Sequence, residues 1–239
     1  MRKIVLNLFL IFFGMAPALN AGIVIDYSIA TALQGHPAAP FYVGFQFFDT
    51  SGAPGNNSVT ISNFNFGGGA AGAGPTLGLG ASGNLTSSVS LFDIDPVAIG
   101  AGTRGFVQQF TPGNNLSFTV NFNGSVNPDL DAFTFQILEN NNGGLFGGVP
   151  GVDLIPIASS EPGFSDALLL VNLDSTVVPT IGSFGHDPGL LVQPSIGPDF
   201  NMGPGTATLI AVPEPSSLTV VALGAVCFAI RRRNRKAGK

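Results

Sequence analysis

The sequence has a single cysteine, no tryptophan and few basic residues outside its two ends. The cysteine, Cys227, lies near the C-terminus. Residues 22–211 can therefore form neither a disulfide nor a thiolate metal site, and they have no cysteine nucleophile. Of the nine Lys and Arg residues, only Arg104 lies in this interior stretch. A nucleic-acid-binding surface needs clustered cationic side chains, so that function is excluded.

Acidic residues dominate the interior instead. Residues 22–211 contain thirteen Asp and Glu side chains against one base, a net charge of −12, whereas the whole chain carries −5. Repulsion between like charges of this number favours a soluble protein. Carboxylate oxygens are also ligands for Ca²⁺, so the composition is compatible with binding of a divalent cation.

The interior combines Phe, Leu, Val and Ile with many Gly, Asn, Ser, Thr and Pro residues, a composition typical of a β protein with many turns. Apolar and polar residues alternate with a period of two, which predicts strands with one buried face. The clearest alternating runs are residues 41–47, 59–62, 116–122 and 133–137, and further candidates are 22–30, 87–92, 105–110, 167–173 and 206–210. This spacing predicts an all-β fold, an antiparallel β-sandwich that is jelly-roll-like. The Gly/Ala-rich stretch 67–83 is expected to be a flexible loop.

The N-terminus has the features of a secretory signal peptide. Arg2 and Lys3 precede an apolar run over residues 4–13, and small residues follow up to Ala21. The run is about half the ~20 residues that a membrane span needs, which favours a cleaved signal helix over a retained anchor. Cleavage is expected after Ala21.

The C-terminus carries a second hydrophobic segment, residues 218–230, followed by a basic tail. Its length, about 20 Å as a helix, is more usual for a buried core helix than for a span. However, it is apolar around its whole circumference, and a cationic cluster that resists translocation follows it. We therefore expect a transmembrane helix that stops at Arg231, Arg232, Arg233, Arg235 and Lys236, with the chain between the two ends exported.

The segment before this helix reads Val212, Pro213, Glu214 and Pro215. Together with the short hydrophobic helix and the arginine cluster, it resembles the PEP-CTERM sorting signal of Gram-negative bacteria. The resemblance implies an exosortase, a membrane protease, as processing partner, transient insertion in the inner membrane, and a product released or attached at the cell surface, often alongside exopolysaccharide. Residues 63–69 and 108–113 are similar to one group of uncharacterised PEP-CTERM proteins, which implies export and β architecture but no activity.

Two pairs of carboxylates are the best candidates for chemistry in the interior: Asp93 with Asp95, and Asp129 with Asp131. Side chains at i and i+2 of an extended segment point to one side. They could bind Ca²⁺, act as the two carboxyls of a glycosidase, or be solvated acids in turns. The proline neighbours of Asp95 and Asp129 favour the turn interpretation.

Other catalytic signatures are weak. The only histidines, His36 and His186, are each followed closely by proline, which places both in turns. No Gly-x-Ser-x-Gly nucleophile elbow occurs. We therefore expect a protein that is not an enzyme and needs no cofactor, apart from a Ca²⁺ ion if the paired aspartates bind one.

These observations predict four segments: a signal peptide (1–21), a β-sandwich domain (22–196), a stalk or linker (197–211) and a sorting signal (212–239). The sorting signal comprises the motif (212–217), the transmembrane helix (218–230) and the basic tail (231–239). The expected function is that of a non-enzymatic structural protein of the cell surface or the extracellular, exopolysaccharide-associated matrix. The alternative is a carbohydrate-binding or Ca²⁺-dependent adhesion module.

Overall fold

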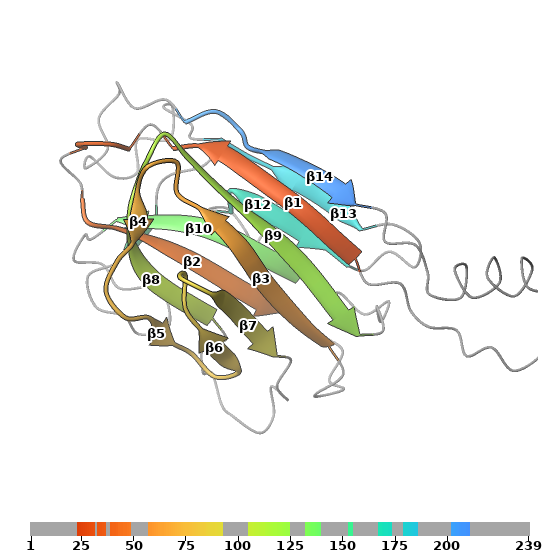
Figure 1. The fold of residues 1–239 in the computed structure, drawn as a ribbon. Coiled ribbons are helices and arrows are strands. Elements are labelled where there is room, and N and C mark those ends of the chain that lie inside the picture. Colours follow the sequence, from red (N-terminus) through yellow and green to blue (C-terminus); the bar gives the residue numbers. More distant parts are fainter. Residues whose placement is uncertain are drawn as a thin grey trace, which may run out of the picture. The chain divides into compact units, whose positions relative to one another are not determined.

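The computed structural model describes residues 23–31, 33–36, 39–48, 57–92, 105–124, 132–139, 153–154, 167–173, 179–185 and 202–210. These ranges contain strands and no helix, and all pairings between strands are antiparallel (Figure 1). The all-β fold is thus confirmed. The expected signal helix and transmembrane helix lie outside the described residues. Within those residues, no helix has the length and apolarity needed to span a membrane.

The strands form two sheets. The first sheet has the order β14 (Thr206–Ile210), β1 (Ile23–Ala30), β9 (Asn115–Gly124), β3 (Asn57–Asn65), β7 (Ser88–Phe92) and β6 (Ala81–Gly83). The second has the order β13 (Thr180–Ser183), β12 (Leu169–Asn172), β10 (Ala132–Glu139), β2 (Phe41–Phe48), β8 (Gly105–Thr111) and β4 (Ala70–Ala71). In addition, β11 (Asp153–Leu154) pairs with β10, and β5 (Thr76–Leu77) pairs with β8.

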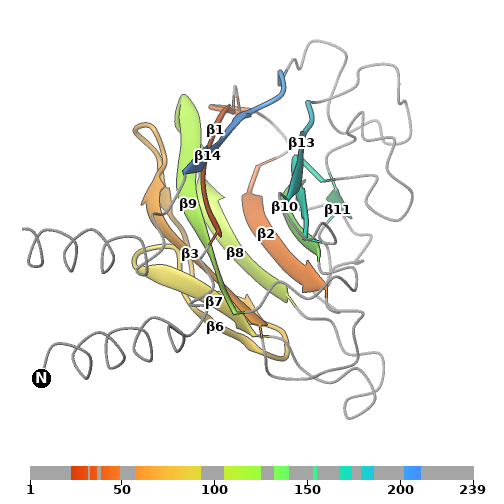
Figure 2. The same cartoon turned by 90° about the vertical axis from the view of Figure 1, so that its right-hand side faces the viewer.

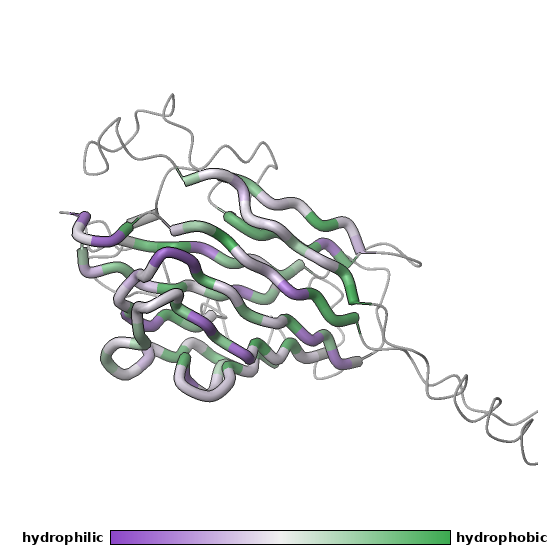
Figure 3. Tube along the Cα trace, turned by 45° about the horizontal axis from the view of Figure 1, so that its top comes forward, coloured by the Kyte–Doolittle hydropathy of each residue, from purple (hydrophilic) through white to green (hydrophobic). Residues whose placement is uncertain are grey.

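The two sheets share one apolar core, which makes the arrangement sandwich-like (Figure 2). The more specific jelly-roll topology stays a prediction. Burial alternates along the strands as the sequence indicates, for example in β1, where Ile25, Tyr27 and Ile29 are buried and each is followed by an exposed residue. Figure 3 shows the same alternation of hydrophilic and hydrophobic residues along the long strands. Burial of one face of each sheet is the main favourable term for this fold.

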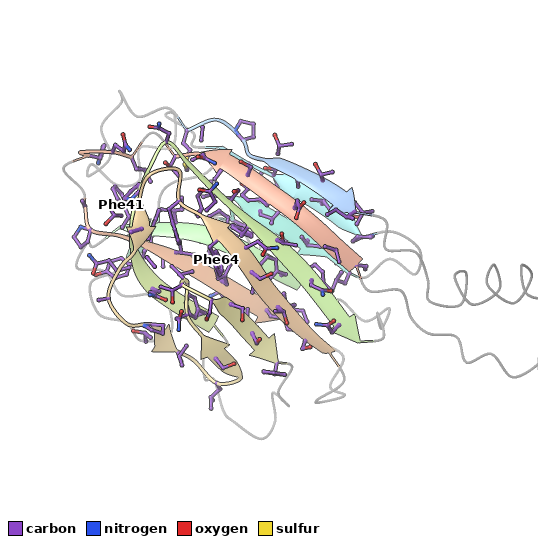
Figure 4. The ribbon with its side chains drawn as sticks, viewed as in Figure 1. Phe41 and Phe64 are labelled. Atoms are coloured by element: carbon purple, nitrogen blue, oxygen red, sulfur yellow. The ribbon has the colours of Figure 1, made fainter. Side chains whose placement is uncertain are left out.

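Aromatic rings fill the centre of the core. Phe45 of β2 lies 5.3 Å from Phe118 of β9 and 5.7 Å from Phe135 of β10, measured between ring centroids. Phe64 of β3 also points into this cluster, with its centroid 6.1 Å from that of Phe45 (Figure 4). Tilted and edge-on ring pairs at such distances add stability beyond their buried area.

The expectation of a flexible loop over residues 67–83 is wrong, because this stretch contains β4, β5 and β6. Its backbone pairs with β8: the Gly72 amide donates to the Gln109 carbonyl at 2.7 Å. A Cβ on Gly72 would lie 2.8 Å from that oxygen, so the small residue permits the close approach. The buried Gln108 side chain also holds the stretch, donating to the Gly72 carbonyl at 3.2 Å and accepting from the Leu85 amide at 2.9 Å.

The expected linker, residues 197–211, contains a strand of the domain. Its residues 206–210 form β14, as the alternation predicted, and β14 pairs along its whole length with β1. Ile23–Ile210 accordingly form one compact unit. The last part of the presumed stalk is therefore an edge strand of the first sheet.

Candidate functional site

Nearly all of the site residues that the sequence predicts lie outside the described residues. These are the cleavage residue Ala21, the motif residues Val212, Pro213, Glu214 and Pro215, the stop residues Arg231, Arg232, Arg233, Arg235 and Lys236, and the aspartates Asp93, Asp95, Asp129 and Asp131. The calcium site on those aspartates therefore stays a prediction. In the ranges that the structure covers, no three His, Cys, Asp or Glu residues come together to hold a metal ion.

Of the two histidines, His186 lies outside the described residues as well. His36 follows a turn at residues 34–35, as the neighbouring proline led us to expect. Its ring packs on Phe41, with the centroids 6.0 Å apart. This contact ties the turn to the core.

The structure does describe the point at which the chain enters and leaves the domain. β1 begins at Ile23, two positions after the expected signal cleavage residue Ala21, and β14 ends at Ile210. The two strands are antiparallel neighbours, with Val24 opposite Ile210. The first residues of β1 and the last of β14 therefore lie side by side at one end of the sheet (Figure 1).

β14 is fixed on the sheet by Tyr27 of β1. This side chain is 2 % exposed, and its hydroxyl donates at 3.2 Å to the carbonyl of Leu168, the residue directly before β12 of the second sheet. Gly205, directly before β14, packs so tightly on the phenol ring that a Cβ there would overlap it. The Ser183 hydroxyl donates to the Gly205 carbonyl at 2.8 Å. Burial raises the pKa of the Tyr27 phenol above its usual value of 10.0, so the hydroxyl keeps its proton into the alkaline range.

A second feature is a groove on the outer face of the first sheet, with a volume of about 340 Å³. Side chains from β14, β1, β9 and β3 line it, and most of those that face outward carry a hydroxyl or an amide. The outward residues that define this groove are Asp26, Ser28, Asn63, Ser117, Thr119, Thr206 and Thr208. We refer to this set as the polar groove.

The centre of the polar groove is a chain of hydrogen bonds. The Asn63 amide donates to the Thr119 hydroxyl at 3.3 Å, and that hydroxyl donates to Asp26 Oδ1 at 2.7 Å. Asn63 reaches Thr119 because β3 has a bulge between Ser62 and Asn65, where Asn63 adopts a left-handed conformation with φ of 57°. Asn tolerates this conformation better than most residues do. Such a chain favours the orientation of the exposed Asp26 carboxylate in which Oδ1 faces Thr119.

Comparison with known proteins identifies the tail. A model of the PEP-CTERM protein-sorting motif matches residues 211–233 and confirms the sorting signal expected from the sequence. The motif implies an exported protein with a membrane-anchored precursor, which an exosortase processes. No curated protein and no solved structure matches the chain, and the sorting-motif model does not cover the β domain.

Proposed function

We propose that this protein is an exported, non-enzymatic structural component of the cell surface or extracellular matrix, whose sorting signal is removed by an exosortase. The observation that carries the proposal is the position at which the β domain ends and the sorting signal begins. The sorting motif begins at residue 211, directly after the last residue of β14. Removal of the tail beyond this point leaves every strand of both sheets in the product.

The position of β14 indicates that removal of the tail leaves a completely folded β domain. Among the described residues, β14 is the last strand and pairs with the first, so the pairing forms only when the chain up to Ile210 is available to β1. An edge strand that is bonded to its neighbour is protected from proteolysis, whereas an extended segment beyond it is accessible. The sequence predicts that the sheet does not continue past β14, because proline fixes φ and has no amide proton to donate, and the motif contains Pro213 and Pro215. We therefore expect the cut to fall beyond the domain.

The structural rather than catalytic role is supported by the interior sequence. It has no cysteine nucleophile and no nucleophile elbow, and both histidines are followed by a proline within two residues. The outer face of the first sheet presents Ser, Thr and Asn side chains along β1, β9 and β3, with one carboxylate, Asp26. A surface of this kind suits contact with a hydrated matrix. A cell-surface or matrix location thus agrees with both the signal and the exposed chemistry.

Fractionation of the native host tests the proposal. Wild-type protein should appear in the cell-surface or extracellular fraction with a mass below that of the full chain. The Glu214→Ala variant, which alters the sorting motif, should stay in the membrane fraction with its basic tail. Glu161→Ala is the matched control, because Glu161 also precedes a proline but lies in the body. Normal processing and release of Glu214→Ala would contradict the role of the motif.

A second experiment addresses the absence of enzymatic activity. The purified secreted form is incubated with the exopolysaccharide of its host, and the reducing ends released are counted. No release above the buffer control is expected. Hydrolysis that disappears in a variant with Asp93→Asn and Asp129→Asn would instead establish a glycosidase. A rise in melting temperature with Ca²⁺ that the same variant abolishes would favour the calcium-dependent adhesion module.

A further inference from the structure

We propose that the polar groove binds a neutral, polyhydroxylated ligand, namely an uncharged stretch of oligosaccharide or polysaccharide. The proposal concerns the body of the protein and does not depend on how its tail is processed. It rests on the register of four strands, on the charge of the groove and on the hydrogen bonds that already orient its side chains.

The register places the groove residues in two rows across the sheet. In one row, Thr208 of β14, Asp26 of β1 and Thr119 of β9 lie directly opposite one another. In the next row, Thr206, Ser28 and Ser117 do the same. Directly opposed side chains on one sheet face are ~4.5–5.5 Å apart at Cβ. Five hydroxyls and a carboxylate are thus concentrated on one small patch.

The charge of the groove excludes two classes of ligand. Asp26 is the only charged side chain that lines it, and the described ranges contain no Lys or Arg at all. An anionic ligand would meet a carboxylate without a compensating cation, in a domain that is itself strongly acidic. A tightly held divalent cation prefers six to eight oxygen ligands and usually several carboxylates, whereas the groove offers one. An uncharged ligand is therefore favoured.

The polarity of the groove excludes a third class. An apolar ligand would cover hydroxyl groups and Asp26 without replacing their hydrogen bonds to water, which costs free energy for each group. A polyhydroxylated ligand can both donate to the carboxylate and exchange hydrogen bonds with Ser and Thr hydroxyls, each of which is donor and acceptor. The groove volume of about 340 Å³ lies at the lower end of the range of small-molecule sites, ~300–1,000 Å³. It fits a short stretch of a chain.

The internal hydrogen bonds prepare the groove for such a ligand. Because the Thr119 hydroxyl donates to Asp26 Oδ1 and accepts from Asn63, it orients the carboxylate before a ligand arrives. A fixed acceptor loses less entropy when it forms a new hydrogen bond. The aromatic residues at the groove, Tyr27 and Phe118, are 2 % exposed and offer no ring face for stacking. We therefore expect weak binding at a single groove, in the micromolar to millimolar range, strengthened where many copies meet one polymer.

The test uses the purified secreted protein and titrations followed by amide NMR. The probes are neutral glucan and galactan oligosaccharides of six units, with hexamers of galacturonic acid as the anionic comparison. Binding of a neutral hexamer should shift the amide signals of Asp26, Asn63 and Thr119 while leaving those of β6 and β7 unchanged. Binding of the acidic hexamer alone, or shifts confined to another face, would overturn the proposal.

Variants show whether binding depends on the polar groove or on any polar side chain of the same sheet face. Asp26→Ala and Thr119→Val should each weaken binding about tenfold, the change expected for loss of one hydrogen bond to a charged group. Thr60→Val is the matched control, because Thr60 points outward from β3 on the same face but does not line the groove. All three variants are first checked for an unchanged strand NMR pattern. Full binding by both groove variants, an equal loss in Thr60→Val, or no binding of any neutral hexamer would each refute the site.

Discussion

Val24 of β1 lies directly opposite Ile210 of β14. These two antiparallel neighbours are the first and the last of the strands that the structure describes. This pairing brings the start of β1, next to the expected signal cleavage residue, beside the end of β14, where the sorting motif begins. The described chain therefore enters and leaves the first sheet at the same end, between the expected signal peptide and the sorting motif. Four residue pairs besides this one continue the register.

An engineered disulfide tests this register. Residues 22–211 contain no cysteine, so Val24→Cys with Ile210→Cys introduces the only pair in the processed protein. Opposed residues in antiparallel strands have Cα atoms ~4.5–5.5 Å apart, within the range for a disulfide. We expect the secreted double variant to contain an internal disulfide, detected by peptide mapping. The control combines Val24→Cys with Thr208→Cys, two positions out of register, and should remain reduced. The opposite outcome in the two variants would contradict the β1–β14 pairing.

Gly205→Ala should loosen β14, because the new methyl group would overlap the Tyr27 ring. Overpacking of this kind costs ~1–3 kcal/mol of the free energy of unfolding. Gly203→Ala is the control, since a Cβ there meets nothing within 4 Å. Chemical denaturation measures the stability, and amide hydrogen exchange in β14 shows whether the loss is local. Equal stability of the two variants would mean that Gly205 does not pack on Tyr27 as described.

Tyr27→Phe should lower stability at neutral pH by about 1 kcal/mol, the value of one hydrogen bond. The loss stays small because the Leu168 carbonyl keeps its bond from the Phe184 amide. Tyr42→Phe, at a residue with an intermediate degree of burial, serves as the control and should change stability less.

Tyr27→Phe and the wild type should also differ in how their stability changes at alkaline pH. Burial raises the folded-state pKa of Tyr27 above its ordinary value of 10.0, so the folded protein retains a proton that the unfolded chain releases. The contribution of Tyr27 to the free energy of unfolding is constant below pH ~10. Above that pH, the free energy of unfolding of the wild type falls by up to about 1.4 kcal/mol per pH unit because of this group. Denaturation curves from pH 8 to 11 should show a shallower decline for Tyr27→Phe than for the wild type. Parallel curves would contradict the buried, neutral phenol.

Gln108→Leu should destabilise the segment that joins β3 to β7. It removes the acceptor of the buried Leu85 amide, and a buried amide left without a partner costs ~1–3 kcal/mol. It also removes the donor to the Gly72 carbonyl, which belongs to an exposed residue and can bind water instead. Gln109→Leu, which changes the adjacent and less buried side chain, should cost less. Comparison of the two denaturation midpoints decides whether the Gly/Ala-rich stretch is held by Gln108 or is independent of it.

The sequence predicts the strands well and their partners poorly. Period-two alternation identifies the core faces around Phe45 and Phe118, because burial of one sheet face requires that pattern. Alternation also finds β14, but an edge strand does not reveal in its own residues whether it pairs with a strand at the other end of the chain. Composition misleads at residues 67–83, where glycine serves close backbone pairing with β8 rather than flexibility.

The polar groove could not be predicted from the sequence, because its central contact joins residues 93 positions apart. One signal of the bulge was nevertheless present. The apolar residues of β3 lie at odd positions up to Ile61 and at even positions from Phe64, and such a change of phase indicates an extra residue between them. The strand that bends to place Asn63 beside Thr119 was therefore detectable, whereas the hydrogen bonds that follow from it were not.

Mass spectrometry of the extracellular protein from hosts with and without the exosortase tests the central claim most directly. With the enzyme present, the chain should begin at Gly22 and end beyond Ile210, with β14 retained and the basic tail lost. Without it, residues 211–239 should remain attached to membrane-bound protein. A product that ends before Thr206, or an intact chain with residues 1–21 and 211–239 in the cytosol, would contradict the account.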